Sequence, residues 1–375
     1  MISKRIGLDL RFYRRETGGI GRYSRNLLLE LLQLDTSNHY TAILTPADEA
    51  EFTLRADNLK KLVVPISHYS MTEQCHLPKI LNAEQFDLVH FTNFNHPLLY
   101  RRRFIVTVHD LIMHLHPTGA QKNSTLRRIA YKLVINDCRR AAKIIVPSLS
   151  TKNDLVRMLG FPSSKVVITP EGSESVFRRA DPALVTALRH RLQLPERYLL
   201  FVSRWEEYKG LLKLVEAHKI LSAEFPELGL VIAGKPDKQN PAVVAQIEAA
   251  KAAGQKIITP GFVSDEDLVP LYTGASVYVH PSLYEGFGIM ILEAMACGAP
   301  VVTSNVSSLP EVAGEAALLV DPRSVSEIAA AIKRLLTNPA LADELRERGF
   351  KRVKQFSWQK MAKQTLEVYR QLLAP

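Results

Sequence analysis

The chain has 375 residues, which is long for one hydrophobic core and predicts two domains. Its composition, 46% hydrophobic and 23% charged, speaks against a disordered chain, and no apolar run approaches the roughly 18 residues of a membrane span. The net charge of +10 lies entirely in residues 1–170, which hold 24 Lys or Arg and 14 Asp or Glu, whereas residues 171–375 hold 24 of each. A basic first half implies an anionic partner: membrane lipid, nucleic acid or a phosphorylated substrate.

The start of the chain predicts a β-strand rather than a secretory signal, because Asp9 and Arg11 interrupt the apolar stretch MISKRIGLDLRF. The cysteines Cys75, Cys138 and Cys297 form no CxxC or other pair pattern, which is typical of free thiols in a reducing compartment. We therefore expect a cytoplasmic protein, peripheral at the inner face of the plasma membrane if its basic half binds lipid.

Short β-branched runs alternate with helical patterns along the whole chain. The first half predicts strands at 6–10, 40–45, 61–66, 87–92, 103–108, 143–148 and 166–170, and helices over 21–34 and 124–142. The second half predicts strands at 198–203, 229–234, 256–261, 277–282, 300–304 and 317–322, and a final amphipathic helix over 356–373. Near-continuous apolar strands between helices indicate parallel sheets covered on both faces. We predict an α/β fold of two doubly wound, Rossmann-like domains facing across a cleft, with the boundary in the polar stretch 171–182.

A glycine-rich loop, ETGGIGRYSRNLL at 16–28, opens the first predicted helix. Gly19, Gly21 and Ser24 nearly match the dinucleotide fingerprint G-x-G-x-x-G/A. The strand lies about seven residues before the first glycine, too far for the tight turn of that motif, and the second strand ends in no acidic residue. A flexible glycine loop followed by Arg22 and Arg25 suits an anionic acceptor or a phosphate equally well.

The segment TVHDL at 107–111 places His109 and Asp110 directly after a strongly apolar strand. A histidine at that end of a strand can donate to a sugar hydroxyl or position a reacting centre, and it can equally be a structural residue. His114 and His116 lie nearby, but no further ligand spacing indicates a metal site.

The segment VSRWEEYKG at 202–210 carries two cations between a strand and a helix. Arg204 follows the strand, and Lys209 precedes a helix that begins near Gly210. Both cations can converge on a diphosphate, unless the segment is only a solvated loop.

The run EGFGIMILEAMACGAPVV, from Glu285 to Val302, carries the most information. Gly286 and Gly288 precede a predicted helix, and a helix N-terminus lined with glycine offers free N–H groups and a positive dipole end to a phosphate. The carboxylates of Glu285 and Glu293 repel a phosphate but accept hydrogen bonds from hydroxyls. A diphosphate flanked by hydroxyls describes a nucleotide sugar.

This run, with SSLPEVAGEAALLVDP at 307–322, resembles the GT-B retaining glycosyltransferases of family 4. The resemblance extends from the first loop to Asp321. In the second half, the Glu-x7-Glu element of the family is matched by Glu285 and Glu293, and its Arg and Lys phosphate clamp by Arg204 and Lys209. In the first half, the glycine-rich loop is matched by Gly18–Gly21 and the HD element by His109–Asp110. One position departs from the family, since Ser203 stands where members commonly have Gly. That departure puts the geometry of this loop in question.

The resemblance implies that a C-terminal domain, 173–355, binds the nucleotide sugar. The N-terminal domain, 1–172 with the C-terminal helix 356–375 crossing back to it, is implied to bind the acceptor. It also implies transfer with retention and no metal or other cofactor. In that picture Glu293 holds the ribose, Glu285 holds the donor sugar, and backbone amides near Phe287 and Gly288 join the cations on the diphosphate. The expected catalytic residues are His109, Arg204, Lys209 and Glu285, and the expected donor-binding residues are Gly19, Gly21, Gly286, Phe287, Gly288 and Glu293.

The chain looks most like bacterial enzymes that extend O-antigen or exopolysaccharide on a lipid carrier, many of them mannosyltransferases that use GDP-mannose. A lipid-linked acceptor at an anionic membrane agrees with the basic first half, where RRIAYKLVINDCRRAAK at 127–143 and YRRRF at 100–104 mix cations with apolar residues. Two alternatives stay open. A GT-B-type epimerase would convert a nucleotide sugar without an acceptor. A nucleic-acid-binding protein would also explain the charge, but no recognisable nucleic-acid module is present.

Overall fold

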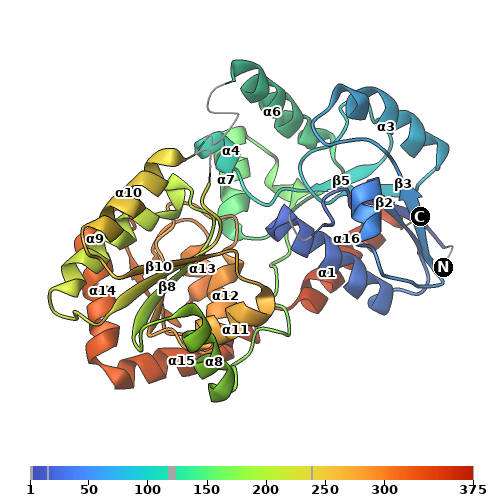
Figure 1. Cartoon of the computed structure of the whole chain (residues 1–375). Helices are drawn as coiled ribbons and strands as arrows, with labels where there is room; N and C mark the ends of the chain where they lie inside the picture. Colours follow the sequence, from blue (N-terminus) through green and yellow to red (C-terminus); the bar gives the residue numbers. More distant parts are fainter. Residues whose placement is uncertain (1–2, 15–16, 117–123, 238–239, 375) are drawn as a thin grey trace. The chain divides into compact units, whose positions relative to one another are not determined.

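The computed structural model describes residues 3–14, 17–116, 124–237 and 240–374, and it divides into two compact units (Figure 1). Unit 1 holds the described residues up to Leu111, those of 124–171, and the C-terminal helix α16 (Trp358–Leu373). Unit 2 holds the described residues of 172–357 together with the short helix α4 (Ile112–Leu115). Pro375, the last residue of the range expected for the C-terminal helix, lies outside the described residues.

Unit 1 is built on a seven-stranded sheet with the order β3-β2-β1-β4-β5-β6-β7, and all of its neighbouring strands are parallel. The strands are β1 (Arg5–Asp9), β2 (His39–Leu44), β3 (Leu59–Val63), β4 (Leu88–Phe91), β5 (Phe104–Thr107), β6 (Ile144–Val146) and β7 (Val166–Ile168). Each lies where an apolar run predicts it, with ends that differ by a few residues. The sequence prediction of a parallel sheet in the first half is confirmed.

The described helices of unit 1 are α1 (Gly19–Leu34), α2 (Pro46–Ala50), α3 (Met71–Ala83), α6 (Thr125–Asp137), α7 (Leu149–Leu159) and α16, with the 3-10 turns η2 (Cys138–Arg140) and η3 (Ser163–Lys165). Four of these helices, α2, α3, α6 and α7, begin after a Ser or Thr whose side chain caps them. The side chain of Ser124, for example, accepts a hydrogen bond from the N–H of Arg127 and so caps α6. The single helix expected over 124–142 is therefore α6 followed by η2.

Helix α16 packs beside α1 in unit 1 and is tied to the sheet through buried side chains. The hydroxyl of Tyr369 lies 2.6 Å from Nδ1 of His90 on β4, and Nε2 of the same histidine lies 2.8 Å from Oγ1 of Thr107 on β5. Tyr23 of α1 completes the network, 3.0 Å from the Thr107 hydroxyl. These four side chains are buried, so the C-terminal helix is an integral part of unit 1.

Unit 2 is built on a six-stranded parallel sheet with the order β10-β9-β8-β11-β12-β13. Its strands are β8 (Tyr198–Val202), β9 (Gly229–Ala233), β10 (Ile257–Gly261), β11 (Val277–His280), β12 (Val301–Ser304) and β13 (Ala317–Val320). Its further helices are α8 (Pro182–Leu192), α9 (Leu211–Ser222), α10 (Pro241–Ala252), α11 (Asp265–Thr273), α12 (Ile289–Ala296), α13 (Leu309–Ala313), α14 (Val325–Thr337) and α15 (Pro339–Val353), with the 3-10 turn η4 (Glu207–Lys209). The strands again lie at the predicted runs.

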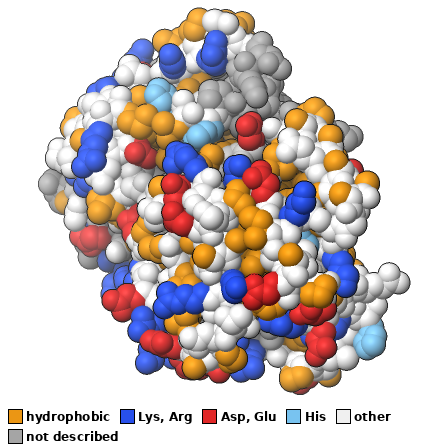
Figure 2. Space-filling model, turned by 90° about the vertical axis from the view of Figure 1, so that its left-hand side faces the viewer, with side chains coloured by type: hydrophobic (Ala, Val, Ile, Leu, Met, Phe, Trp, Pro, Cys, Tyr) orange, Lys and Arg blue, Asp and Glu red, His pale blue; other side chains and the backbone are white. Residues whose placement is uncertain are grey.

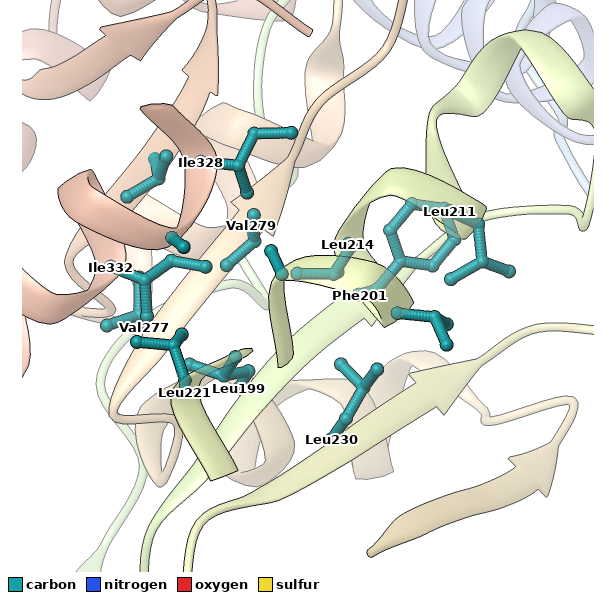
Figure 3. Packing of buried hydrophobic residues seen from close by; sticks show 14 of the residues in the cluster. Leu199, Phe201, Leu211, Leu214, Leu221, Leu230, Val277, Val279, Ile328 and Ile332 are labelled. Atoms are coloured by element: carbon teal, nitrogen blue, oxygen red, sulfur yellow. The ribbon is translucent and has the colours of Figure 1, made fainter. Parts of the chain in front are cut away.

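The core of unit 2 forms where α9 and α14 cover the sheet (Figure 3). Side chains of β8, β9 and β11 point toward those of the two helices, and nearly all are fully buried. The labelled residues are Leu199, Phe201, Leu211, Leu214, Leu221, Leu230, Val277, Val279, Ile328 and Ile332. Burial of each large apolar side chain contributes roughly 1.5–3 kcal/mol, so this layer holds the strand ends in position.

Each sheet has one point at which the chain order reverses. In unit 1 this switch point lies between β1 and β4, and in unit 2 it lies between β8 and β11. Loops that leave two adjacent strands in opposite directions open a crevice at the carboxyl edge, where ligands of doubly wound sheets bind. These two edges are therefore the places where functional side chains are to be sought.

One face of the molecule carries charges of both signs. Figure 2 looks onto the side on which α9, α10 and α14 of unit 2 lie in Figure 1, and acidic and basic side chains are interspersed over it. Within the described part of the chain, no helix combines the length and the apolar character needed to cross a membrane.

Candidate functional site

A buried ion pair stands at the switch point of unit 2. Lys209, at the end of the loop that follows β8, places Nζ 2.7 Å from Oε1 and 2.9 Å from Oε2 of Glu285, which lies in the loop after β11. His280, the last residue of β11, places Nε2 2.8 Å from the same Oε1. The Lys209 and Glu285 side chains are only 9% and 10% exposed. Two of the expected catalytic residues are therefore in direct contact.

The charge state of Glu285 follows from these partners. Burial raises the pKa of its carboxyl, but the Lys209 ammonium and the His280 hydrogen bond outweigh burial and bring that pKa down to about 2. Glu285 is thus a carboxylate at neutral pH. It accepts hydrogen bonds from Lys209 and His280, and an ionised carboxylate of this kind also binds sugar hydroxyls.

His280 and Tyr278 are buried polar residues of the candidate site that the sequence reasoning missed. A carboxylate only accepts, so Nε2 of His280 donates to Glu285, and Nδ1 then accepts from the Tyr278 hydroxyl at 3.2 Å. Both side chains are fully buried. A signal was present in the sequence, because a tyrosine and a histidine two residues apart on an otherwise apolar strand lie on the same face of the sheet.

Local backbone geometry brings the two loops together. Gly210 has a φ of 71°, and a Cβ at this position would collide with the carbonyl oxygen of Pro281. The N–H of Leu283 donates to the carbonyl of Tyr208 at 2.7 Å and joins the same loops. Because only glycine permits this approach, Gly210 sets the distance between Lys209 and Glu285.

The start of α12 is held by two serines. Gly288 caps the helix with a φ of 96°, and the hydroxyl of Ser308 donates to the carbonyl of Phe287 at 2.9 Å. Ser307 donates to the carbonyl of Glu285 at 2.6 Å. These two hydrogen bonds fix the backbone of the segment 285–288, which connects Glu285 to the first turn of α12.

Glu293, the second expected carboxylate, has a buried tyrosine among its partners. It sits in α12, is 2% exposed, and accepts a hydrogen bond of 3.2 Å from the Tyr272 hydroxyl. Burial raises the pKa of Tyr272 well above its ordinary value, and the Glu293 carboxylate raises it further. Tyr272 in turn packs against Tyr278, and the Tyr278 hydroxyl contacts His280, so buried side chains connect Glu293 with the Glu285 site.

Arg204 is the exposed cation of this edge. Its side chain is 74% exposed, and its NH2 lies 3.5 Å from Oε2 of Glu206. Glu206 itself accepts a hydrogen bond of 2.6 Å from the Tyr208 hydroxyl. Ser203 is not among the residues with a positive φ, and the close approach at this point is made by Gly234, whose Cβ would collide with the Ser203 carbonyl. Serine at 203 therefore fits without backbone strain.

In unit 1, His109 is held through both ring nitrogens. Nε2 lies 2.9 Å from the carbonyl oxygen of Thr92, and Nδ1 lies 3.3 Å from Oε1 of Glu171. Burial lowers the pKa of His109, but the hydrogen bond and charge of Glu171 more than offset burial, so the pKa lies above its ordinary value. Both partners are acceptors, which favours the protonated ring. Direct donation to a sugar hydroxyl requires one of these contacts to open.

The glycine loop before α1 has a packing role. A Cβ on Gly21 would collide with the side chain of Thr17, whereas one on Gly19 would meet nothing within 4 Å among the described residues. Gly18 caps α1 with a φ of 67°. Gly21 therefore allows close packing of the loop. Gly19 is exposed at the first position of α1. The N–H groups of the first turn of a helix have no acceptor within the helix and can donate to a ligand.

Two family profiles match the chain. The profile described as "Glycosyltransferase Family 4" covers residues 17–174, and the one described as "Glycosyl transferases group 1" covers residues 188–352. The chain is 32% identical to O-antigen chain mannosyltransferase B of Escherichia coli over 76% of its own length and 74% of that protein. It is also 29% identical to the serotype-specific mannosyltransferase WbdA of Escherichia coli over 72% of its own length, but spans only 33% of that longer protein.

Solved structures share the fold over nearly the whole chain. Sucrose-phosphate synthase from Thermosynechococcus elongatus is 24% identical, with a TM-score of 0.78 over 99% of both chains. HepE from Anabaena, in complex with UDP and glucose, is 17% identical, with a TM-score of 0.77 over 98% of this chain and 100% of that one.

Proposed function

Because this chain belongs to the glycosyltransferase family and has the GT-B fold, we propose that it moves a hexosyl group, namely mannosyl, from a nucleotide sugar to a glycan acceptor. The process served is the assembly of a cell-surface polysaccharide. The observation that carries the proposal is the pairing of Lys209 with an ionised, buried Glu285 at the switch point of unit 2. This site offers a cation to a diphosphate and a carboxylate to a sugar.

The cations act on the leaving group. A nucleoside diphosphate gains negative charge as the glycosidic bond breaks, so fixed positive groups stabilise the transition state more than the ground state. Lys209 provides a buried ammonium, and Arg204 provides an exposed guanidinium on the same loop. A charge-assisted hydrogen bond is worth roughly 1.5–3 kcal/mol, so loss of one cation slows transfer about tenfold to more than a hundredfold.

The carboxylates act on hydroxyls. Glu285 lies beside Lys209, and we assign it to the donor sugar, while Glu293 is assigned to the ribose. The Tyr272 hydroxyl orients the Glu293 carboxylate, which lowers the entropy cost of binding a diol. Phe287, Gly286 and Gly288 are assigned to the diphosphate through the backbone at the start of α12.

We further propose retention of configuration and no requirement for a metal. The positive charge that a metal would supply comes from Lys209 and Arg204 in this assignment. Two measurements test these points. NMR of the product from an α-configured donor should show an α-linkage, and transfer should persist in EDTA. A β-linked product, or activity that returns only on adding Mg²⁺, would overturn the respective point.

The donor is proposed to carry mannose, because the curated relatives named above are mannosyltransferases. GDP-mannose is the first candidate, and UDP-glucose is the comparison, since the HepE structure holds UDP and glucose. A bound donor raises the melting temperature by mass action. We expect GDP-mannose to raise it more than UDP-glucose does; the reverse order would reassign the donor, and no shift with any nucleotide sugar would overturn the function.

Catalytic assignment is tested with Glu285→Gln and Lys209→Met beside the control Lys213→Ala. Lys213 is 42% exposed and forms a surface ion pair with Glu216, one helical turn away. Surface ion pairs of this kind contribute little, so replacement of Lys213 should leave transfer unchanged. Both site variants should lose at least tenfold in kcat. Assays with and without acceptor also exclude an epimerase, which would convert the donor alone.

We propose that the acceptor is lipid-linked and that unit 1 contacts the membrane through helix α6. Leu126, Ile129 and Leu133 share one side of this helix and are 76%, 51% and 57% exposed; we call them the α6 stripe. Exposed Arg127, Arg128 and Lys132 flank the stripe. An exposed apolar stripe between cations suits the interface of an anionic bilayer.

Vesicle flotation tests the membrane proposal. The protein should float with vesicles that contain phosphatidylglycerol, and replacement of all three stripe residues by serine should abolish flotation. Leu184→Ser is the matched control, because Leu184 is 58% exposed but lies on α8 of unit 2. Equal flotation with phosphatidylcholine alone, or equal flotation of the triple variant, would overturn this assignment.

A further inference from the structure

Aromatic rings gather at the carboxyl edge of the unit 1 sheet. Phe12 follows β1, and His68 and Tyr69 follow β3. The rings of Phe12 and His68 stack with centroids 3.7 Å apart and planes 11° apart, and Tyr69 stands edge-on to both at 6.4 Å. We call these three residues the aromatic platform. Phe94, which follows β4, lies 6.3 Å from Tyr69.

Tyr69 is presented to the surface in a strained conformation. Its φ of 55° lies in the left-handed region, which side chains other than glycine rarely adopt, and its side chain is nonetheless 60% exposed. Burial of the ring therefore does not explain the strain. A strained backbone that displays an aromatic ring at a ligand-binding edge indicates a functional position.

A buried charge network maintains this conformation. The N–H of Tyr69 donates to Oε2 of Glu73 at 2.8 Å, and Oε1 of Glu73 accepts from Arg11 at 2.6 Å and from Asn95 at 2.7 Å. Arg11 also donates two hydrogen bonds to Asp9, at 2.7 and 2.8 Å. Arg11 and Glu73 are at most 1% exposed. The guanidinium of Arg11 therefore binds carboxylates of the protein and is not accessible to an anionic ligand.

A second observation points to a ligand that carries hydroxyls. The hydroxyl of Tyr131 is buried, its residue is 7% exposed, and it has no hydrogen-bond partner among the described residues. Its ring stands edge-on to Phe94, with centroids 5.5 Å apart. Nδ1 of His68, in the platform itself, is likewise without a partner in the described part of the chain. Such buried polar atoms are costly unless a bound molecule satisfies them.

We infer that the aromatic platform binds a neutral sugar ring of the acceptor glycan by stacking, with Tyr69 as the principal contact. The C–H face of a hexose is apolar and packs on an aromatic ring such as that of Tyr69. The His68 ring nitrogen and the Tyr131 hydroxyl are buried, so they meet the hydroxyls of the sugar once the neighbouring rings move aside on binding. None of the three platform residues is an arginine or a lysine. The inference rests on the proposed function, because it names how that reaction's acceptor is held.

Saturation-transfer NMR with an α-linked mannose disaccharide, in the absence of donor, tests the platform directly. The wild-type protein should transfer saturation to the disaccharide, and Tyr69→Ala should lose the signal. Tyr69→Phe should keep it, because the ring remains and the Tyr69 hydroxyl makes only a long contact of 3.4 Å with Asn93. A signal that persists in Tyr69→Ala, or none in the wild type, would overturn the inference.

Kinetics provide the second readout and separate this inference from the proposed function. In Tyr69→Ala the KM for the disaccharide should rise roughly three- to tenfold, the scale of one aromatic contact, with the donor-induced melting shift unchanged. An unchanged KM would overturn the platform. If no nucleotide sugar raised the melting temperature of the wild type, the proposed function would be overturned instead. The NMR experiment, which uses no donor, would then still test whether the platform binds a sugar. Leu99→Ala, an exposed apolar residue elsewhere in unit 1, serves as the surface control.

Discussion

Lys209 and Glu285, 76 residues apart in the sequence, form a buried two-point ion pair in which Nζ lies 2.7 and 2.9 Å from the carboxylate oxygens. The pair fixes a cation and an acceptor side by side at the edge of the unit 2 sheet. A donor that binds there must exchange part of this contact for its own diphosphate and hydroxyls. Under the proposed function, the pair holds an ammonium and a carboxylate in fixed positions for that exchange.

Removal of one partner should destabilise the protein more than removal of both. Lys209→Met or Glu285→Gln alone leaves a buried polar group without its partner, and breaking a buried pair costs about 3–5 kcal/mol. The double variant should recover much of this loss in urea unfolding, while transfer stays absent. Additive losses in the double variant would show that the pair is not coupled.

Acid should weaken the protein through His90. Burial lowers the pKa of this histidine to about 3, below the ordinary value of 6.5, so the unfolded chain binds the proton more readily than the folded one. His90 therefore contributes its full stability above pH 6.5 and loses it as the pH falls toward 3, by up to about 1.4 kcal/mol per pH unit. Urea unfolding between pH 6.5 and 4.5 should show a shallower pH dependence in His90→Gln than in the wild type. Equal slopes would contradict this role.

Gly210 and Gly254 offer a matched pair of substitutions. Both have a positive φ, 71° and 87°, but a Cβ on Gly210 collides with Pro281 whereas one on Gly254 meets nothing within 4 Å of the described atoms. Gly254→Ala should cost only the backbone strain, about 1–2 kcal/mol. Gly210→Ala should cost clearly more in thermal unfolding and should also reduce donor binding, because it displaces Lys209. Equal effects would exclude the steric role.

The protonation of His109 should depend on Glu171. Burial alone lowers the pKa of the imidazole, and Glu171 reverses that direction, so Glu171→Gln should bring the pKa of His109 down from its raised value. An NMR titration of the ring measures this. In the wild type, the stabilising contribution is complete below the ordinary value of 6.5 and disappears as the pH rises through the raised pKa. A titration that is unchanged in Glu171→Gln would assign the shift to another group.

Much of the candidate site was predictable because its residues follow strands. Apolar runs locate the ends of β8 and β11, and ligands of such sheets bind at those ends, which led to Arg204, Lys209 and Glu285. The contact of His280 with Glu285 was not predictable in the same way, since the spacing of Tyr278 and His280 shows that they share a face of the sheet but not what that face meets. That contact depends on the position of Glu285, which lies in the next loop.

The sequence by itself determined the type of each segment and the residues that stand at the strand ends, because burial requires apolar periodicity and turns require glycine or polar residues. Only the tertiary structure decided which of those residues meet. Strand order places β1 beside β4 and β8 beside β11. Hydrogen bonds between residues far apart in the sequence then join Lys209 to Glu285, and Arg11 to the Glu73 carboxylate that also binds Tyr69. Such contacts depend on distances between segments that local spacing does not contain. For this reason the candidate site of unit 2 was visible in the sequence, and the aromatic platform was not.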